Sequence, residues 1–149
     1  MYKAVTRIAA RRVIGALNDG DPRPLLALTT AETELSFPGA NSFAQMFRPV
    51  AKGREAHASH RGADECRAFA ERFVAEGLRL EVEDVLVNGP PWRMRLAIRA
   101  HDHTPGPDGD LYNNRAVAFL EVRWGRIRRW EDYLDTERIA AWEAAAAHA

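Results

Sequence analysis

The order of helical and strand-like segments predicts an α+β fold in which a strongly curved antiparallel sheet wraps helices from the N-terminal part. Apolar residues recur at helical spacing early in the chain, whereas apolar and polar residues alternate from residue 78 to residue 134. Short turn sequences separate the alternating segments, which favours antiparallel hairpins. Such a sheet forms a cone that is open at one end, where a small ligand has room to bind.

Two helices are expected at the N-terminus. Apolar side chains fall near a 3.6-residue period and predict an amphipathic helix over about residues 3–18. The sequence Asn18-Asp19-Gly20 ends this helix. Asp21 then caps a second, short helix with Pro22 in its first position, where the missing N–H costs no hydrogen bond.

A short strand and a third helix follow. Residues 31–37 alternate as a strand. Residues 38–62 are rich in Pro, Gly, Asn and Ser and form the least regular stretch, which we expect to be a lid or a pocket rim. The third helix is expected from Asp64 to Glu76, with Gly77 after its last turn.

Four strands are expected to form the long part of the sheet. Their predicted ranges are Leu78–Val87, Trp92–His103, Leu111–Trp124 and Ile127–Leu134. Asn88-Gly89 and Trp124-Gly125-Arg126 are typical of tight hairpin turns. Asp135 has the position and residue type of the N-cap of a final helix.

Composition excludes several functional classes. With 149 residues the chain has the size of one domain, 1–149. Lys+Arg and Asp+Glu number 21 each, so we expect neither nucleic acid nor an anionic membrane as a partner. No apolar run approaches the roughly 20 residues of a membrane-spanning helix. The single cysteine, Cys66, suits a reducing compartment, and we expect a cytoplasmic protein.

We expect no metal and no other cofactor. His57 and His60 lie three residues apart in the irregular stretch, and His101 and His103 share one face of a strand. Neither pair has the helical spacing typical of metal sites, and no Cys or Asp pattern completes a set of ligands.

Asp132 is the most informative polar residue. It lies on the last predicted strand between Trp130 and Leu134, and a buried unpaired charge is costly, so it needs a partner or a chemical role. Arg95 is the candidate partner. Two interpretations are open: a structural ion pair between two strands, or a functional carboxylate that Arg95 orients.

Residues around Asp132 are candidates for a ligand pocket. Asn114 shares a strand face with Ala116 and Ala118, whose small side chains leave volume near the carboxylate. The candidate substrate-binding residues are Asn114, Glu34, Trp130, Leu134, Ile14, Leu17 and Phe37.

Three stretches resemble the nuclear transport factor 2-like superfamily, which includes ketosteroid isomerase, limonene-epoxide hydrolase and SnoaL-like polyketide cyclases. They are Ala16–Asp21, Asn88-Gly89, and Gly125-Arg126-Ile127 together with Trp130–Asp135. The resemblance implies a cone-shaped, cystatin-like fold with a pocket for a small, largely apolar or partly polar ligand.

The resemblance is closest to the limonene-epoxide hydrolase branch from Asn88 onward. It places one catalytic aspartate of that branch on Asp132 and its arginine on Arg95, whereas the second aspartate falls on Ala97. The supporting Tyr and Asn fall on Glu34 and Ser36. Opening an epoxide needs a base for water and an acid for the leaving oxygen, so this reaction requires Glu34 to act as the second acid.

Other branches imply other outcomes. The catalytic groups of ketosteroid isomerase fall on Val13, Phe37 and Ala118, which excludes that activity. The polyketide-cyclase branch tolerates a single acid/base. We therefore expect isomerisation, cyclisation, dehydration or hydration of a small, largely apolar substrate; the alternative is a non-catalytic module of the same fold that binds a ligand or dimerises.

The strand Trp92–His103 has two possible registers. The family resemblance directs Arg95 and Ala97 into the pocket, whereas simple alternation directs Met94, Leu96 and Ile98 inward. We adopt the family register, which a dimer covering the outer face would permit.

Neither face of the next strand is cleanly polar. Val117 and Phe119 alternate with Ala116 and Ala118. Because exposed apolar strand faces usually mark an interface, we expect a homodimer through the outer face of the sheet.

Overall fold

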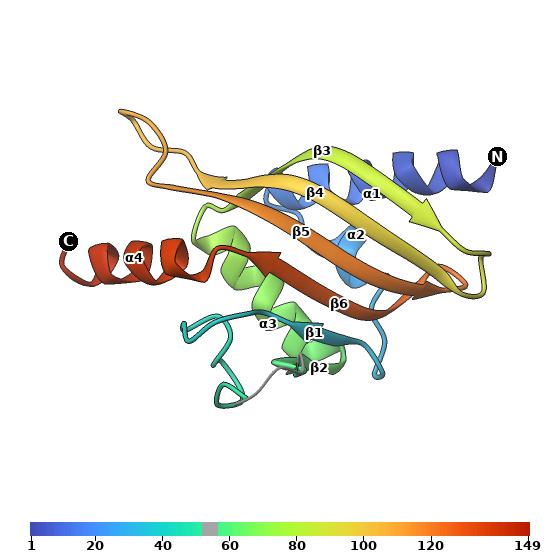
Figure 1. Ribbon diagram of the computed structural model, residues 1–149, viewed down its shortest axis with the longest axis horizontal. Helices are drawn as coiled ribbons and strands as arrows, with labels where there is room; N and C mark the ends of the chain where they lie inside the picture. Colours follow the sequence, from blue (N-terminus) through green and yellow to red (C-terminus); the bar gives the residue numbers. More distant parts are fainter. Residues whose placement is uncertain (52–56) are drawn as a thin grey trace.

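The computed structural model describes residues 1–51 and 57–149, and in these residues it confirms the α+β fold with a curved sheet and N-terminal helices (Figure 1). The elements are α1 (Tyr2–Asn18), α2 (Arg23–Leu26), β1 (Glu34–Ser36), β2 (His60–Arg61), α3 (Gly62–Ala75), β3 (Arg79–Asn88), β4 (Met94–Thr104), β5 (Tyr112–Arg123), β6 (Arg126–Leu134) and α4 (Thr136–Ala147). Within the described residues, no helix is long and apolar enough to cross a membrane.

The sheet has the strand order β2-β1-β6-β5-β4-β3. Strands β3 to β6 pair as consecutive antiparallel hairpins, as predicted. One pair departs from the prediction, because β1 runs parallel to β6 with Leu35 beside Trp130. The strand β2 was not expected and lies in the predicted rim at 38–62, whose residues 52–56 fall outside the described part of the chain.

Two hairpin turns form where the sequence predicts them. Gly89 has φ +82°, and a Cβ there would lie 2.3 Å from the carbonyl oxygen of Arg93, so only glycine fits. Trp124 and Gly125 have φ values of 49° and 76°, the positive pair that a type I′ hairpin requires. The indole of Trp124 packs on Trp92, with ring centroids 5.9 Å apart.

Helix α1 protects the free edge of the sheet at β3. The Arg11 guanidinium donates hydrogen bonds to the carbonyl oxygens of Val82 and Glu83, at an irregularity in the pairing of β3 with β4. Asn18 exchanges two hydrogen bonds of 2.8 Å with the backbone of Leu80. These contacts occupy edge groups that are otherwise free to pair with another strand.

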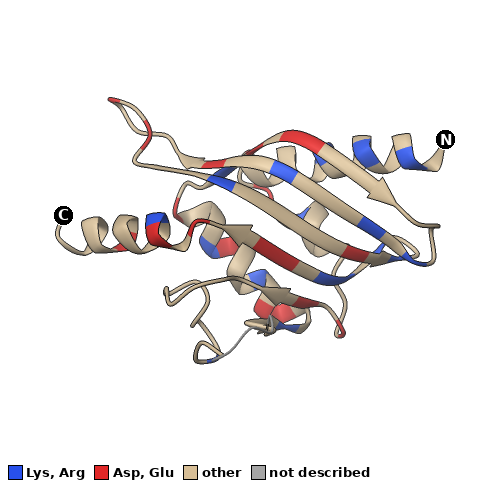
Figure 2. Cartoon of the chain, in the orientation of Figure 1, with Lys and Arg blue, Asp and Glu red and all other residues tan. Residues whose placement is uncertain are grey.

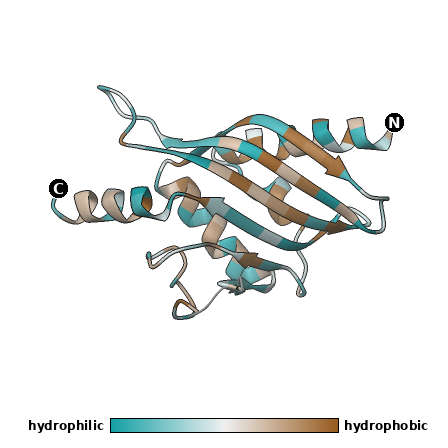
Figure 3. Cartoon of the chain, in the orientation of Figure 1, coloured by the Kyte–Doolittle hydropathy of each residue, from teal (hydrophilic) through white to brown (hydrophobic). Residues whose placement is uncertain are grey.

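The register of β4 follows simple alternation, so the predicted family register is wrong. Met94, Leu96 and Ile98 are buried in the core, whereas Arg95 is exposed. The reverse register exposes three large apolar side chains and buries a guanidinium. The alternation is visible along the strands in Figure 3.

Two helices begin at or next to the residues that the sequence predicts. Asp135 caps α4 as predicted, because its Oδ1 accepts hydrogen bonds from the N–H groups of Glu137 and Arg138. The helix α2 begins one residue later than predicted, with Pro22 in the cap position. Acidic and basic residues are interspersed over helices and strands (Figure 2), in keeping with the zero net charge.

Candidate active site

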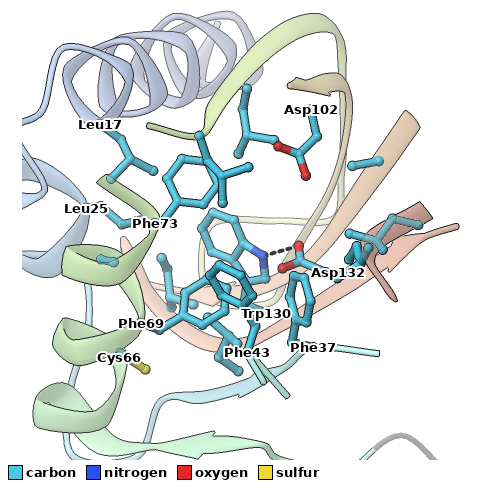
Figure 4. A pocket seen from close by; sticks show the side chains of 18 of the residues that line it. Leu17, Leu25, Phe37, Phe43, Cys66, Phe69, Phe73, Asp102, Trp130 and Asp132 are labelled. Carbon is cyan, nitrogen blue, oxygen red and sulfur yellow. Dashed lines mark hydrogen bonds between the residues drawn. The ribbon is translucent and has the colours of Figure 1, made fainter. Parts of the chain in front are cut away.

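A cavity lies between the concave face of the sheet and the helices (Figure 4). Its wall is mostly aromatic and aliphatic, with Leu17, Phe37, Phe43, Phe69, Phe73 and Trp130 among the lining side chains. The cavity has a volume of about 60 Å³. This volume corresponds to a few water molecules, at roughly 10–15 Å³ for each.

Asp132 projects from β6 into this cavity. Its strand partner is Ala118 of β5, and Trp130, two residues before it, faces the same side. The indole Nε1 of Trp130 donates a hydrogen bond of 2.6 Å to Asp132 Oδ1 (Figure 4). Asp132 is half-buried, because part of its surface borders the cavity, and protein atoms surround its carboxylate.

The surroundings of Asp132 favour its neutral form. Burial raises the pKa of Asp132 to about 7, and the negative charge of Asp102 acts in the same direction. The hydrogen bond from Trp130 opposes this increase in the pKa. Among the residues that the structure describes, no Arg or Lys forms an ion pair with Asp132.

A second carboxylate, Asp102 of β4, faces the same cavity (Figure 4). The Tyr112 hydroxyl donates to Asp102 Oδ2 at 3.4 Å and accepts a hydrogen bond of 2.9 Å from Asn114 Nδ2. Within the described residues, Asp102 Oδ1 is buried without a hydrogen-bond partner. Burial raises the pKa of Asp102 to about 7, whereas the Tyr112 hydrogen bond and the charges of His103 and His101 lower it.

Comparison with known proteins identifies the family. A model of the SnoaL-like domain matches residues 10–130, which is most of the chain. The chain belongs to the SnoaL-like family of the nuclear transport factor 2-like superfamily. A comparison with curated proteins finds no match.

Solved structures show the same fold as this SnoaL-like chain. A nuclear transport factor 2-like protein of unknown function from Burkholderia pseudomallei is 16% identical, with a TM-score of 0.66 over 90% of this chain and 93% of that one. TerC, co-crystallised with polyporic acid, is 15% identical, with a TM-score of 0.65 over 90% and 94%. A putative polyketide cyclase from Sinorhizobium meliloti is 15% identical, with a TM-score of 0.55 over 84% and 93%.

Five of the residues that the sequence predicts for the site line the cavity. They are Leu17, Phe37, Trp130, Asp132 and Leu134. Ile14 is buried in the adjoining apolar core. Asn114 is buried behind the wall, where its side-chain amide bonds the Tyr112 hydroxyl and the carbonyl oxygen of Asp135.

The predicted contact between Arg95 and Asp132 is wrong. Asp132 pairs with Ala118, which pairs with Ile98, and these cross-strand neighbours share the inner face. Arg95 lies an odd number of residues from Ile98 and is exposed on the outer face, beside Glu121.

Glu34 also lies away from the cavity. Its neighbour Leu35 lines the cavity, so alternation along β1 directs Glu34 to the other side, between Arg61 and Arg129. The prediction of Glu34 as a substrate-binding residue is therefore wrong, and Glu34 does not supply the second acid that epoxide opening requires.

Asp102 is the polar residue that the sequence analysis missed. The signal that identifies it is the inward series Met94, Leu96, Ile98 and Ala100, which reaches Asp102 two residues further on. The family register exchanges the two faces of β4, so it directs these residues and Asp102 outward. Two carboxylates that face one apolar cavity can divide the roles of acid and base.

Proposed function

We propose that this chain carries out acid–base chemistry on a small, largely apolar substrate, with Asp132 as the group that transfers the proton. The observation that supports the proposal is a carboxylate deep in an apolar cavity whose burial raises its pKa to about 7. A catalytic acid or base works best when its pKa lies near the working pH. The reaction class is isomerisation, cyclisation, dehydration or hydration.

The hydrogen bond from Trp130 determines which oxygen of Asp132 reacts. The indole N–H occupies Oδ1 at 2.6 Å, which leaves Oδ2 for the substrate. As a carboxylate, Oδ2 accepts a proton from a carbon next to a carbonyl group; as a carboxylic acid, it returns that proton to another carbon or to oxygen. The apolar wall excludes water, so the ion in this step interacts with Trp130 rather than with solvent.

Asp102 is proposed to bind the polar end of the substrate. Asp102 lines the cavity, Tyr112 holds its Oδ2, and its buried Oδ1 has no partner in the described part of the chain. An oxygen that lacks a partner in a buried site gains a hydrogen bond when a substrate hydroxyl or enol enters.

Covalent catalysis by the cavity thiol is not part of the proposal. Cys66 lines the cavity, but burial raises the pKa of its thiol to about 11. A thiol is a weak nucleophile compared with its thiolate, so Cys66 serves as a small apolar wall residue.

Solvent-deuterium exchange tests the proposal without knowledge of the natural substrate. Small cyclic ketones with acidic C–H bonds are incubated with the chain in D₂O, and label at the α-carbon is followed by mass spectrometry. We expect protein-dependent exchange that Asp132→Asn abolishes and Asp108→Asn, in an exposed loop, leaves unchanged. Equal exchange by the two variants contradicts the proposal.

The non-catalytic alternative has a distinct outcome in the same experiment. The cavity volume of about 60 Å³ favours it, because so small a space leaves little room to bring a substrate carbon beside the carboxylate. In that case the ketones bind and quench tryptophan fluorescence, while α-carbon exchange stays at the rate without protein for the whole panel.

We also propose that the chain forms a homodimer in the cytoplasm. Val117 and Phe119 lie half-buried on the outer face of β5, which supports a contact with a second copy. The free, buried thiol of Cys66 supports a reducing compartment. Light scattering at micromolar concentration is expected to give the mass of two chains, and a monomer mass contradicts the dimer.

A further inference from the structure

Three side chains of metal-ligand type converge on the outer face of the sheet. His101 and His103 alternate with Asp102 along β4, so they project from the face opposite the cavity. Glu81 of β3 is the cross-strand neighbour of His101. One ligand atom from each of Glu81, His101 and His103 lies within 4.8 Å of the other two.

Neighbouring oxygen atoms determine which imidazole nitrogens carry hydrogen. His103 Nδ1 lies 3.0 Å from Asp110 Oδ1, and His101 Nε2 lies 2.7 Å from Asn113 Oδ1. A carboxylate or an amide carbonyl oxygen only accepts hydrogen bonds, so both of these nitrogens donate. The opposite nitrogens, His103 Nε2 and His101 Nδ1, therefore present lone pairs in the neutral rings.

Both of these nitrogens lie near the carboxylate of Glu81. His103 Nε2 lies 3.2 Å from Oε1 and His101 Nδ1 lies 3.7 Å from Oε2. His103 is 8% exposed, and its Nε2 has no hydrogen bond in the described residues. The two imidazole rings stack in parallel, with centroids 4.7 Å apart. A cation bound by all three groups requires the two rings to turn out of this stack, because an imidazole nitrogen binds a metal in the plane of its ring.

We propose that Glu81, His101 and His103 bind one Zn²⁺ ion, separate from the cavity. Two imidazole nitrogens and one carboxylate oxygen are a known zinc ligand set, completed by water in the fourth position. Bonds of about 2.0–2.2 Å in a tetrahedron place ligand atoms about 3.3–3.6 Å apart. The three ligand atoms here lie within 4.8 Å of one another, so small side-chain movements bring them to these distances. Mg²⁺ and Ca²⁺ prefer all-oxygen ligands and do not fit.

The surroundings suit a metal site in two further ways. Asp110 and Asn113 hold the far nitrogens of the two rings, the arrangement that orients and strengthens histidine ligands. The Glu81 side chain is 66% exposed, so an ion can enter from solvent. The expectation from sequence that the chain has no metal rested on helical spacing, whereas here two residues on one strand are completed by a third from the next strand.

Zinc titration of the full chain tests the proposal. Tag-free, chelator-treated protein is titrated with ZnCl₂ by calorimetry, and we expect saturable binding of one ion per chain. His103→Gln and Glu81→Gln are each expected to weaken binding at least about 100-fold, and Asp110→Asn by about 10- to 100-fold because it orients a ligand. The control His148→Gln, at the exposed C-terminal end, is expected to bind as the wild type does.

Two further readouts complete the test. Co²⁺ in place of Zn²⁺ is expected to give the intense visible absorption of a tetrahedral site, which Glu81→Gln removes. Because Glu81 is largely exposed, this variant keeps the wild-type circular dichroism even if His103→Gln fails to fold. Absence of zinc binding by the wild type, or equal affinity in Glu81→Gln and His148→Gln, overturns the proposal.

Discussion

Replacing Asp132 with Asn is expected to stabilise the protein at alkaline pH. Burial raises the folded-state pKa of Asp132 from 3.8 to about 7, so the folded chain binds this proton more tightly than the unfolded chain does. The stability that the folded chain gains from this tighter proton binding is fully present below pH 4, and it is lost as the pH rises through the folded-state pKa near 7. Asparagine remains neutral throughout and keeps an oxygen that accepts from Trp130 Nε1.

The magnitude follows from the two pKa values. About three pH units at 1.36 kcal/mol each give about 4 kcal/mol of lost stability between pH 4 and pH 8. Because Asn removes this loss, Asp132→Asn gains up to about that amount over the wild type at pH 8 and little at pH 4. A gain of this kind is common where a site retains a destabilising group for function.

Urea denaturation at several pH values measures this effect. The free energy of unfolding is obtained for the wild type, Asp132→Asn and the exposed control Asp108→Asn between pH 4 and pH 8. We expect the difference between Asp132→Asn and the wild type to grow with pH, and Asp108→Asn to follow the wild type. A constant difference across this range refutes a raised pKa of Asp132.

Three other substitutions test separate parts of the structure. Trp130→Phe removes the donor to Asp132 and is expected to raise the carboxyl pKa of Asp132 further in a ¹³C NMR titration; an unchanged or lower pKa contradicts the assigned hydrogen bond. Gly89→Ala places a Cβ 2.3 Å from a backbone oxygen. It is expected to lower stability by more than Gly125→Ala, because the new Cβ of Gly125→Ala meets open space and only the positive φ there costs about 1 kcal/mol. Equal losses of stability in thermal unfolding count against this turn geometry. Arg95→Ala is expected to leave deuterium exchange unchanged, because Arg95 lies on the outer face of the sheet. Loss of exchange in this variant supports the family register, in which Arg95 faces the cavity.

Local chemistry accounts for the parts of the fold that the sequence predicts well. The hairpin at Asn88-Gly89 and the N-cap at Asp135 depend on residues within a few positions of each other. The parallel pairing of β1 with β6 joins Leu35 to Trp130, almost a hundred residues away, and short strands such as β1 and β2 carry little periodicity. Such pairing depends on the packing of the whole sheet rather than on local preference.

Sequence likewise predicts only part of the candidate site. The position of Asp132 is predictable, because Trp130 and Leu134, two residues before and after it, direct that face of the strand into the apolar interior. Asp102 was missed although alternation points to it, because a register carried over from distant relatives reversed the two faces of β4. The proposed zinc ligands come from two strands and depend on the cross-strand register, which short-range spacing does not contain.

The pKa of Asp132 tests the central claim most directly. Asp carboxyl carbons are labelled with ¹³C, titrated by NMR from pH 3 to pH 9, and assigned by the signal that disappears in Asp132→Asn. The structure predicts that this signal titrates near pH 7, because the carboxylate is buried in an apolar cavity without a cationic partner in the described residues. A midpoint near the ordinary aspartate value of 3.8 contradicts both the burial of Asp132 and its proposed role in proton transfer.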